Sequence, residues 1–319
     1  MITKNVDRAI ELLLDEDVVA IPTETVYGLA GNALSEKALK KIFTLKNRPL
    51  FNPLIVHIGG FNQLQKIARD IPEKAIQLAL HFWPGPLTLV LKKQTHIPDL
   101  VTSGKDTVAI RMPNHPLTLE LLNQIDFPLA APSANPFGKI SPTSAAHVYD
   151  YFGENVTAIL DGGDCERGVE STIIGFENEV PVLYRVGSIS VEEIESVVGE
   201  VTSPQNNSEI KSPGMLQSHY APRTDTILND NPQKLLGSLE GKKIGLLLFK
   251  DELGQKNVSA IEVLSKKGDL KEAAKNLYAA MHRLDNLDLD LIIAERLPDY
   301  GLGSTINDRL TRASSKYTL

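Results

Sequence analysis

Helical and extended apolar patterns alternate along this chain, and the alternation restricts it to the α/β folds. Ile10, Leu13 and Leu14 share one helical face, and residues 18–21 follow as a continuous apolar strand. Ser35 is a suitable N-cap for a second helix, and Pro49 a suitable stop. We expect further strands at residues 54–58, 87–91, 107–111 and 129–131, and a hairpin formed by residues 173–176 and 180–185.

Start and stop signals mark other helices. Thr143 is the predicted N-cap of a helix that runs to Phe152 with Gly153 as its stop, and Ser190 with Glu193 forms a capping-box pattern. Residues 201–211 are polar and aperiodic, which is typical of a linker. A second strand and helix pattern follows: strands at 243–249 and 289–295, a helix capped at Asp269, and a last helix after Gly303-Ser304. We therefore predict α/β domains at 1–203 and 223–319, joined by a linker or lid at 204–222.

Composition narrows the class of protein. A chain of 319 residues can form two domains with well-buried cores, and its net charge of −7 argues against a broad nucleic-acid-binding face while permitting a local basic pocket. The single cysteine, Cys165, excludes an intrachain disulfide or a multi-cysteine zinc site, and we assign it no catalytic role. The sequence shows no signal peptide and no apolar run that could span a bilayer. We expect a soluble, cytoplasmic protein.

The common nucleotide and hydrolase motifs are absent. Residues 138–141, Gly-Lys-Ile-Ser, lack the earlier glycine and the Lys-Ser adjacency of a phosphate loop. The sequence contains no Gly-x-Gly-x-x-Gly after a strand, no Gly-x-Ser-x-Gly and no His-Glu-x-x-His. Standard kinase, dehydrogenase, serine-hydrolase and zinc-protease chemistry is therefore not indicated.

Two other segments do suggest a ligand site. Residues 46–57, Lys-Asn-Arg-Pro-Leu-Phe-Asn-Pro-Leu-Ile-Val-His, place two cations, two amides and a histidine between a predicted helix and a predicted strand. Residues 133–141, Ser-Ala-Asn-Pro-Phe-Gly-Lys-Ile-Ser, follow an apolar strand with small hydrogen-bonding side chains. Guanidinium and ammonium groups match phosphate or carboxylate, and small residues let a ligand approach the backbone. These segments indicate a nucleotide site of an uncommon kind.

Together with residues 22–29, Pro-Thr-Glu-Thr-Val-Tyr-Gly-Leu, these segments resemble the YrdC-like family of L-threonylcarbamoyladenylate synthases. The family's signature pairs Lys-x-Arg with Ser-x-Asn, here Lys46/Arg48 and Ser133/Asn135. Residues 168–174, 212–215, 219–222 and 301–310 also resemble family segments, the last three those of its long form. The resemblance implies an α/β fold: a twisted mixed-sheet YrdC-like domain with a concave site, plus a smaller Rossmann-like α/β C-terminal domain.

The family's reaction, implied by the resemblance, joins L-threonine, bicarbonate or CO₂ and ATP into threonylcarbamoyl-AMP and pyrophosphate. Downstream transferase proteins then modify the tRNA adenosine beside the anticodon. Mg²⁺ is expected through the ATP phosphates, with no metal site made by the protein alone. Family matching gives the catalytic set as Lys46, Arg48, Ser133 and Asn135. It gives the L-threonine set as Thr25, His57, Arg111, Ser133 and Ser171, and the ATP set as Arg48, Asn52, Thr107, Ala131, Ser141, Arg185 and Tyr220.

The residues taken singly leave other interpretations open. Lys46 and Arg48 also suit a solvated helix C-terminus, where cations complement the helix dipole. Arg111, at the end of a predicted apolar strand, suits a clamp on an amino-acid carboxylate or a structural ion pair, and His57 suits a buried core position. Glu24 and Glu170 suit a role in holding magnesium or orienting a donor, but by default we expect solvated or helix-capping carboxylates.

Two departures from the family pattern stand out. The late strand ends in Arg185-Val186-Gly187, where the family commonly has Arg-Pro-Gly, so the orientation of Arg185 is less fixed by the backbone. Residues 216–218, before His219-Tyr220, lack the usual basic or aromatic side chains. Two rival functions also remain: a non-catalytic RNA-binding module of the same fold, and a related carbamoyltransferase domain with a different acceptor.

Overall fold

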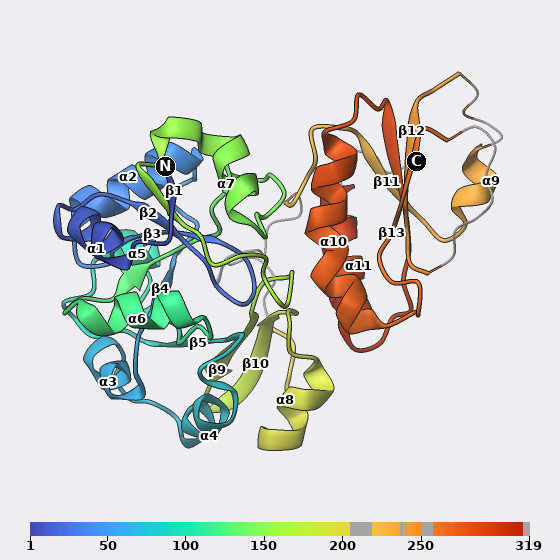
Figure 1. Ribbon diagram of the computed structural model, residues 1–319. Helices are drawn as coiled ribbons and strands as arrows, with labels where there is room; N and C mark the ends of the chain where they lie inside the picture. The colour runs from blue at the N-terminus through green and yellow to red at the C-terminus, as the bar shows by residue number, and fades with distance from the viewer. Residues whose placement is uncertain (205–218, 237–238, 240, 251–257, 315–319) are drawn as a thin grey trace.

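The computed structural model describes residues 1–204, 219–236, 239, 241–250 and 258–314 (Figure 1). Within these residues the first domain contains a mixed sheet of ten strands in the order β1-β8-β2-β3-β7-β4-β6-β5-β9-β10. The strands are β1 (Ile2–Thr3), β2 (Val19–Ile21), β3 (Gly28–Asn32), β4 (Ile55–His57), β5 (Leu87–Lys92), β6 (Thr107–Arg111), β7 (Leu129–Ala130), β8 (Ala158–Leu160), β9 (Thr172–Glu177) and β10 (Val180–Arg185). The predicted hairpin is confirmed, because β9 and β10 pair antiparallel.

Helices cover this sheet, and their ends follow local sequence signals. They are α1 (Val6–Leu14), α2 (Glu36–Lys46), α3 (Leu64–Ile67), α4 (Glu73–Phe82), α5 (Asp99–Thr102), α6 (Pro116–Gln124), α7 (Ala145–Phe152) and α8 (Val191–Val198), with 3₁₀ turns at Phe61–Gln63 and Gly153–Asn155. Ser35 caps α2 as predicted, by accepting a hydrogen bond from the Ala38 amide. The capping box at Ser190 and Glu193 is also confirmed.

Three predicted helix ends are wrong by a few residues. Helix α2 ends at Lys46, before Pro49, because Asn47 adopts a left-handed conformation with φ of 50°. The N-cap of α7 is Ser144 and not Thr143, since the Ser144 hydroxyl accepts the His147 amide. The last helix begins at Leu302, before Gly303-Ser304.

The second domain, in the described part of the chain, is a four-stranded parallel sheet in the order β11-β14-β12-β13. Its elements are β11 (Thr226–Asn229), α9 (Pro232–Leu236), β12 (Ile244–Leu248), β13 (Ala260–Val263), α10 (Leu270–Asp285), β14 (Leu291–Glu295) and α11 (Leu302–Ala313). Figure 1 shows α10 and α11 on the side of this sheet that faces the first domain. The predicted two-part α/β architecture is confirmed; the exact domain boundaries stay a prediction.

One hydrophobic cluster crosses the boundary between the domains. Val26, Ile140 and Val169 of the first domain share it with α10 and α11 side chains such as Leu277 and Ile306. Burial of apolar area is the main favourable term in association, so this shared cluster holds α10 and α11 against the loops of the first domain. None of the described helices is both long enough and apolar enough to cross a lipid bilayer.

Candidate active site

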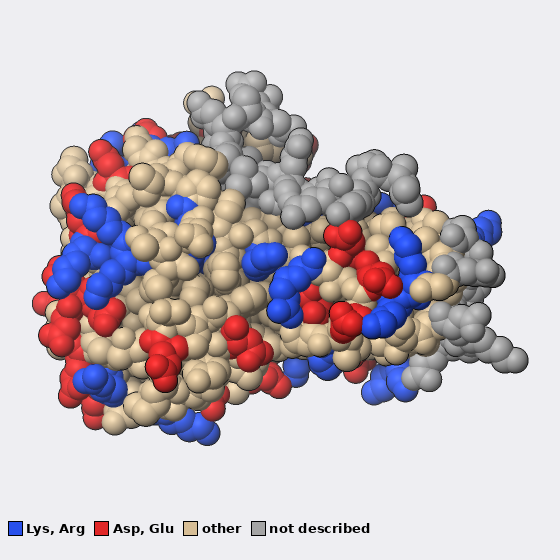
Figure 2. Space-filling view, turned by 90° about the horizontal axis from the view of Figure 1, so that it is seen from above, with Lys and Arg blue, Asp and Glu red and all other residues tan. Residues whose placement is uncertain are grey.

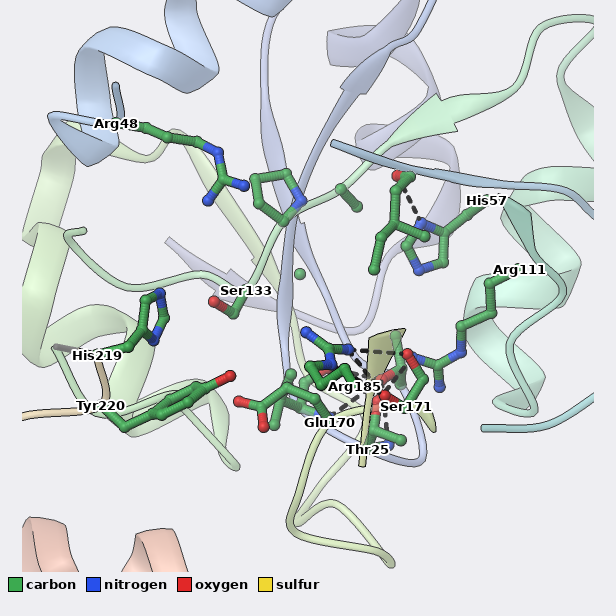
Figure 3. A pocket seen from close by; sticks show the side chains of 16 residues that line it. Thr25, Arg48, His57, Arg111, Ser133, Glu170, Ser171, Arg185, His219 and Tyr220 are labelled. Atoms are coloured by element: carbon green, nitrogen blue, oxygen red, sulfur yellow. Dashed lines mark hydrogen bonds between the residues drawn. The ribbon is translucent and has the colours of Figure 1, made fainter. Parts of the chain in front are cut away.

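A pocket lies where loops of the first domain meet the start of the second (Figure 3). Sixteen side chains line it. Those that were predicted to bind a substrate or act in catalysis are Thr25, Arg48, His57, Arg111, Ala131, Ser133, Ser171, Arg185 and Tyr220. Segments far apart in the sequence, from the loop after β2 to the linker, therefore converge on one cavity. Its free volume of about 50 Å³ is small because His219 and Tyr220 of the linker lie inside it, only 7% and 1% exposed.

Arg111 is the centre of one end of the cavity. Strand β6 ends with this residue, and its Nη1 donates to Thr25 Oγ1 at 2.8 Å while its Nη2 forms an ion pair with Glu24 Oε1 at 2.7 Å. Nε donates to the Gly85 carbonyl at 3.2 Å. A guanidinium carries five N–H groups, so each terminal nitrogen keeps a second N–H for a ligand. The structural ion pair and a clamp on a ligand carboxylate are thus compatible.

His57 lies beside Arg111 at the same end, since β4 and β6 pair in parallel with these two residues in register. Burial, together with the Arg111 cation, lowers the pKa of His57 to about 3. The imidazole is therefore neutral near pH 7. A neutral ring in this place adds no cation that would compete with Arg111 for a carboxylate.

Two more guanidiniums line the cavity: Arg48 lies on the side away from Arg111, and Arg185 lies between them. Arg48 donates from Nε to the Asn52 carbonyl at 3.0 Å and from Nη2 to the Pro53 carbonyl at 2.7 Å. Arg185 donates from Nε and Nη2 to the Ser171 carbonyl, at 3.1 and 2.9 Å. Burial and the neighbouring Arg185 charge lower the pKa of Arg48. Two buried cations that repel one another form a site for a polyanion, whose charge relieves the repulsion.

The signature pairs Lys46/Arg48 and Ser133/Asn135 divide between the cavity and its support. Arg48 and Ser133 line the cavity. Lys46 lies behind it, 1% exposed, and its ammonium donates to the carbonyls of Ser133 and Asn135. Asn135 Nδ2 donates to the carbonyls of Pro136 and Lys139, both at 2.9 Å. The observed contacts of Lys46 and Asn135 therefore fix the shape of the loop that presents Ser133.

Three residues of the predicted ATP set do not line the cavity as described: Asn52, Thr107 and Ser141. Asn52 is fully buried, and neither polar atom of its side chain has a hydrogen-bond partner among the described residues. Thr107 is the first residue of β6 and is partly exposed. The Ser141 hydroxyl donates a hydrogen bond to Glu170 Oε1 at 2.7 Å, so in this conformation it does not donate to a ligand.

The default expectation for Glu24 and Glu170 is wrong. Both are buried, at 3% and 5% exposure, and both bind arginines: Glu24 forms its ion pair with Arg111, and Glu170 forms one with Arg309 at 2.8 Å. Burial alone raises the pKa of the Glu170 carboxyl, but the Arg309 and Arg185 charges outweigh it and bring the pKa to about 2. An isolated carboxylate in a sequence gives no sign of such long-range pairing.

Tyr220 closes the cavity from the linker side. Its ring is buried, and its hydroxyl has no hydrogen-bond partner among the described residues, although Figure 3 shows it directed into the cavity. Buried hydroxyls are nearly always hydrogen-bonded, so this orphaned group indicates a ligand that completes the site. The other linker segments named from the sequence, residues 212–215 and 216–218, lie outside the described residues.

The fold and the cavity together define a class of protein: a two-domain α/β protein whose first domain carries a cavity lined by arginines and hydroxyl side chains. Residues 11–187 match the family described as "Telomere recombination", and residues 189–315 match "Threonylcarbamoyl-AMP synthase, C-terminal domain". The chain is 44% identical to the threonylcarbamoyl-AMP synthase of Pyrococcus abyssi over 93% of this chain and 90% of that protein. It is 42% identical to that of Bacillus subtilis, over 96% and 92%.

Solved structures agree. The crystal structure of P. abyssi Sua5 complexed with L-threonine superposes with a TM-score of 0.90 and 42% identity, covering 97% of this chain and 94% of that one. Escherichia coli YciO, at 21% identity and a TM-score of 0.53 over 59% of this chain and 93% of its own, shares the fold of the first domain. The chain belongs to the Sua5/YciO/YrdC family, in its long form with the threonylcarbamoyl-AMP synthase C-terminal domain. The predicted family is confirmed.

Proposed function

We propose that this chain makes threonylcarbamoyl-AMP and pyrophosphate from L-threonine, bicarbonate or CO₂, and ATP. One observation carries the proposal: a single cavity has Arg111 and Thr25 on one side, Arg48 and Ser133 on the other, and Arg185 between them on Ser171. That order suits an amino acid and a nucleotide lying end to end. The names of the long relatives and the L-threonine bound to P. abyssi Sua5 support the same activity.

L-Threonine occupies the Arg111 end in this proposal. The remaining N–H groups of Arg111 bind its carboxylate, and Thr25, His57, Ser133 and Ser171 surround its amine and side chain. The neutral amine adds to CO₂ and loses a proton, which gives a carbamate. Because Glu24 is already paired with Arg111, the local charge near the ligand is balanced before threonine enters.

ATP occupies the Arg48 side of the cavity in this proposal, and its phosphates reach Arg185. A carbamate oxygen forms a bond to the α-phosphorus while the bond from that phosphorus to the bridging oxygen of the leaving pyrophosphate breaks. Fixed cations stabilise the charge that develops on phosphate, and a shared cavity supplies the alignment, so this step needs no covalent enzyme intermediate. Lys46 and Asn135 support it by holding the Ser133 loop.

Mg²⁺ accompanies ATP in this proposal and is held mainly by phosphate oxygens. The described residues contain no group of three or more His, Cys, Asp or Glu side chains that could hold a metal ion. Among the described residues, the carboxylate that lines the cavity is Glu170, which already accepts bonds from Arg309, Tyr278 and Ser141. Such a site fits magnesium bound through substrate phosphates, where the ion neutralises charge on the leaving group.

The linker acts as a lid in this proposal. Its residues His219 and Tyr220 fill the cavity, and the remaining volume of about 50 Å³ is far below the roughly 300–1,000 Å³ of ordinary ligand pockets. Substrates therefore enter after these side chains move outward, and the Tyr220 hydroxyl then closes on the nucleotide. Closure excludes water from the reactive carbamate.

The product is passed to transferase proteins that act on tRNA, in a soluble cytoplasmic setting. A non-catalytic RNA-binding role is less favoured by the surface. On the face shown in Figure 2, Lys and Arg lie among Asp and Glu. Exposed pairs on α2 show this mixing directly: Lys40 with Glu36, and Lys37 with Glu16. A broad phosphate-binding face requires one dominant sign.

The test is a pyrophosphate-release assay with each substrate omitted in turn, followed by mass analysis of the products. Release that requires threonine and bicarbonate together, with a product of the mass of threonylcarbamoyl-AMP, supports the proposal. Equal release when either is omitted rejects it. Tight, strongly salt-dependent tRNA binding without pyrophosphate release would support the RNA-binding alternative.

A further inference from the structure

The second domain reaches the wall of the cavity through one carboxylate. Glu170 lines the cavity, and the Tyr278 hydroxyl on α10 contacts both of its oxygens, at 3.0 and 2.9 Å. Arg309 on α11 donates from Nε to Glu170 Oε2 at 2.8 Å. Arg309 and Tyr278 are fully buried, and both belong to the second domain; neither is among the residues that line the cavity. Their partner, Glu170, belongs to the candidate active site. These interdomain contacts therefore act on the site and not only on the interface between the domains.

Arg309 also touches two other parts of the nucleotide end. Its guanidinium carbon lies 5.0 Å from the centre of the Tyr220 ring, which is cation–π geometry. Its Nη2 donates to the Val186 carbonyl at 2.7 Å, directly after Arg185. A valine leaves this strand end less constrained than proline would, and the hydrogen bond from α11 supplies a constraint from outside the strand. One side chain thus connects the lid tyrosine, the carboxylate and the strand end.

The contacts of Arg309 matter for the site because Glu170 carries a negative charge there. An uncompensated carboxylate beside Arg48 and Arg185 would repel a triphosphate and would compete for the same cations. The Arg309 cation compensates it from behind, so the carboxylate repels an anionic ligand less. Removing one partner of a buried ion pair leaves the other charge without compensation, so the loss of Arg309 acts on the cavity itself.

We infer that Arg309 is a positioning residue for nucleotide binding, through which the docked C-terminal domain orients Tyr220 and neutralises Glu170. The inference rests on the proposed function in one respect: it takes the Arg48 side of the cavity, as far as Arg185, as the ATP side. It assigns the second domain a direct part in forming the site. Separation of the domains is then expected to weaken ATP binding more than it weakens threonine binding.

The experiment compares calorimetric binding of a non-hydrolysable ATP analogue and of L-threonine to the full-length chain. Arg309→Met is expected to weaken binding of the analogue by at least about tenfold, and threonine binding by less than about threefold. Arg309→Lys keeps the charge without the planar fork and is expected to fall between wild type and Arg309→Met. The matched control is Arg283→Met on α10, whose exposed ion pair with Glu262 lies outside the contact, and no change is expected.

A double variant separates positioning from mere folding. Glu170→Gln added to Arg309→Met removes the uncompensated carboxylate, so binding of the analogue is expected to recover by at least about fivefold relative to Arg309→Met alone. If Arg309→Met does not fold, the affinities for the ATP analogue and for threonine are compared in Arg309→Lys and Tyr278→Phe instead. Equal losses for both ligands, or no recovery in the double variant, would overturn the inference. A wild-type chain that binds neither ligand would instead refute the proposed function.

Discussion

Arg111 and Glu24 form an ion pair of 2.7 Å at one end of the cavity, with side chains only 4% and 3% exposed. The backbone amide of Asn114 also donates to Glu24, at 3.0 Å. The carboxylate therefore holds the guanidinium at a fixed orientation, with N–H groups left over for a ligand. A group fixed in this way loses little conformational entropy when it binds a carboxylate.

Arg111→Lys is expected to weaken threonine binding by at least about tenfold, because an ammonium cannot present the planar fork that pairs with two carboxylate oxygens while also contacting Thr25 and Glu24. Affinity for an ATP analogue is expected to change less than about twofold, since the nucleotide end has its own cations. Calorimetric titration with each ligand measures both. Arg69→Lys, an exposed arginine, is the control. A larger loss of nucleotide affinity than of threonine affinity would contradict the assignment of the two ends.

Lys46→Met is expected to lower kcat/KM for both ATP and threonine, because the carbonyls of Ser133 and Asn135 lose their donor and the loop between the two ends shifts. Each unsatisfied buried acceptor costs about 1–3 kcal/mol, so thermal unfolding should also move to lower temperature. Lys41→Met, on the same helix with a partly exposed Asp17 partner, is expected to stay within about 0.5 kcal/mol of wild type. Loss of kcat/KM for ATP alone would indicate a direct phosphate contact by Lys46.

Gly168 places the backbone of the first domain against α10. Its φ is +71°, and a Cβ there would lie 2.3 Å from the Lys275 carbonyl oxygen and 2.6 Å from that of Ala274. Gly168→Ala is therefore expected to push the domains apart and to cost at least about 2 kcal/mol beyond the left-handed backbone penalty. Gly104→Ala, at φ +77° with nothing within 4 Å, isolates that backbone penalty. Denaturant unfolding measures the free energy of unfolding of both variants. Equal destabilisation would contradict the prediction, because it would show that α10 moves to admit the new methyl group at no cost.

The contact between the domains is expected to weaken in acid. The rings of His147 on α7 and His282 on α10 stack at 4.0 Å, and His282 Nε2 donates to the Ser141 carbonyl at 3.2 Å. Burial, together with the His147 ring, lowers the pKa of His282 to about 3 from an ordinary 6.5. The unfolded chain then binds the proton more readily, so stability is lost as pH falls below 6.5 towards 3.

Between pH 7.5 and 5.0, the wild type is expected to lose about 2 kcal/mol more stability than His282→Gln, which cannot gain the charge. Chemical unfolding at each pH measures this difference. Stability curves that run parallel over this range would show that His282 titrates normally in the folded protein.

Tyr220→Phe and Tyr220→Ala separate the hydroxyl from the ring. The first removes only the hydroxyl, which lacks a hydrogen-bond partner among the described residues, and the second also removes the ring on which Arg309 stacks. Both are expected to weaken ATP binding, the alanine variant by at least about tenfold, while threonine affinity falls much less. Stopped-flow or equilibrium titration with the analogue measures the loss. Unchanged nucleotide affinity in Tyr220→Ala would count against the lid.

The alternation of apolar patterns determined the α/β class, and local signals such as the Ser35 cap and the 173–185 hairpin placed elements to within a few residues. These features depend on residues that are close in the sequence. Capping hydrogen bonds and the spacing of apolar side chains can therefore be recognised from the sequence alone. The ordered motifs also identified Arg48, Arg111 and Ser133 before any contact was known. Three other residues of the same predicted sets, Asn52, Thr107 and Ser141, do not line the cavity.

Only the tertiary structure decided how those residues divide their work. Lys46 and Arg48 are two positions apart, yet the left-handed turn at Asn47 sends one behind the Ser133 loop and the other into the cavity. Glu170 finds Arg309 across 139 positions of sequence, from another domain. Pairing of buried charges depends on distance and desolvation in the folded state, and neither quantity is a property of a sequence segment.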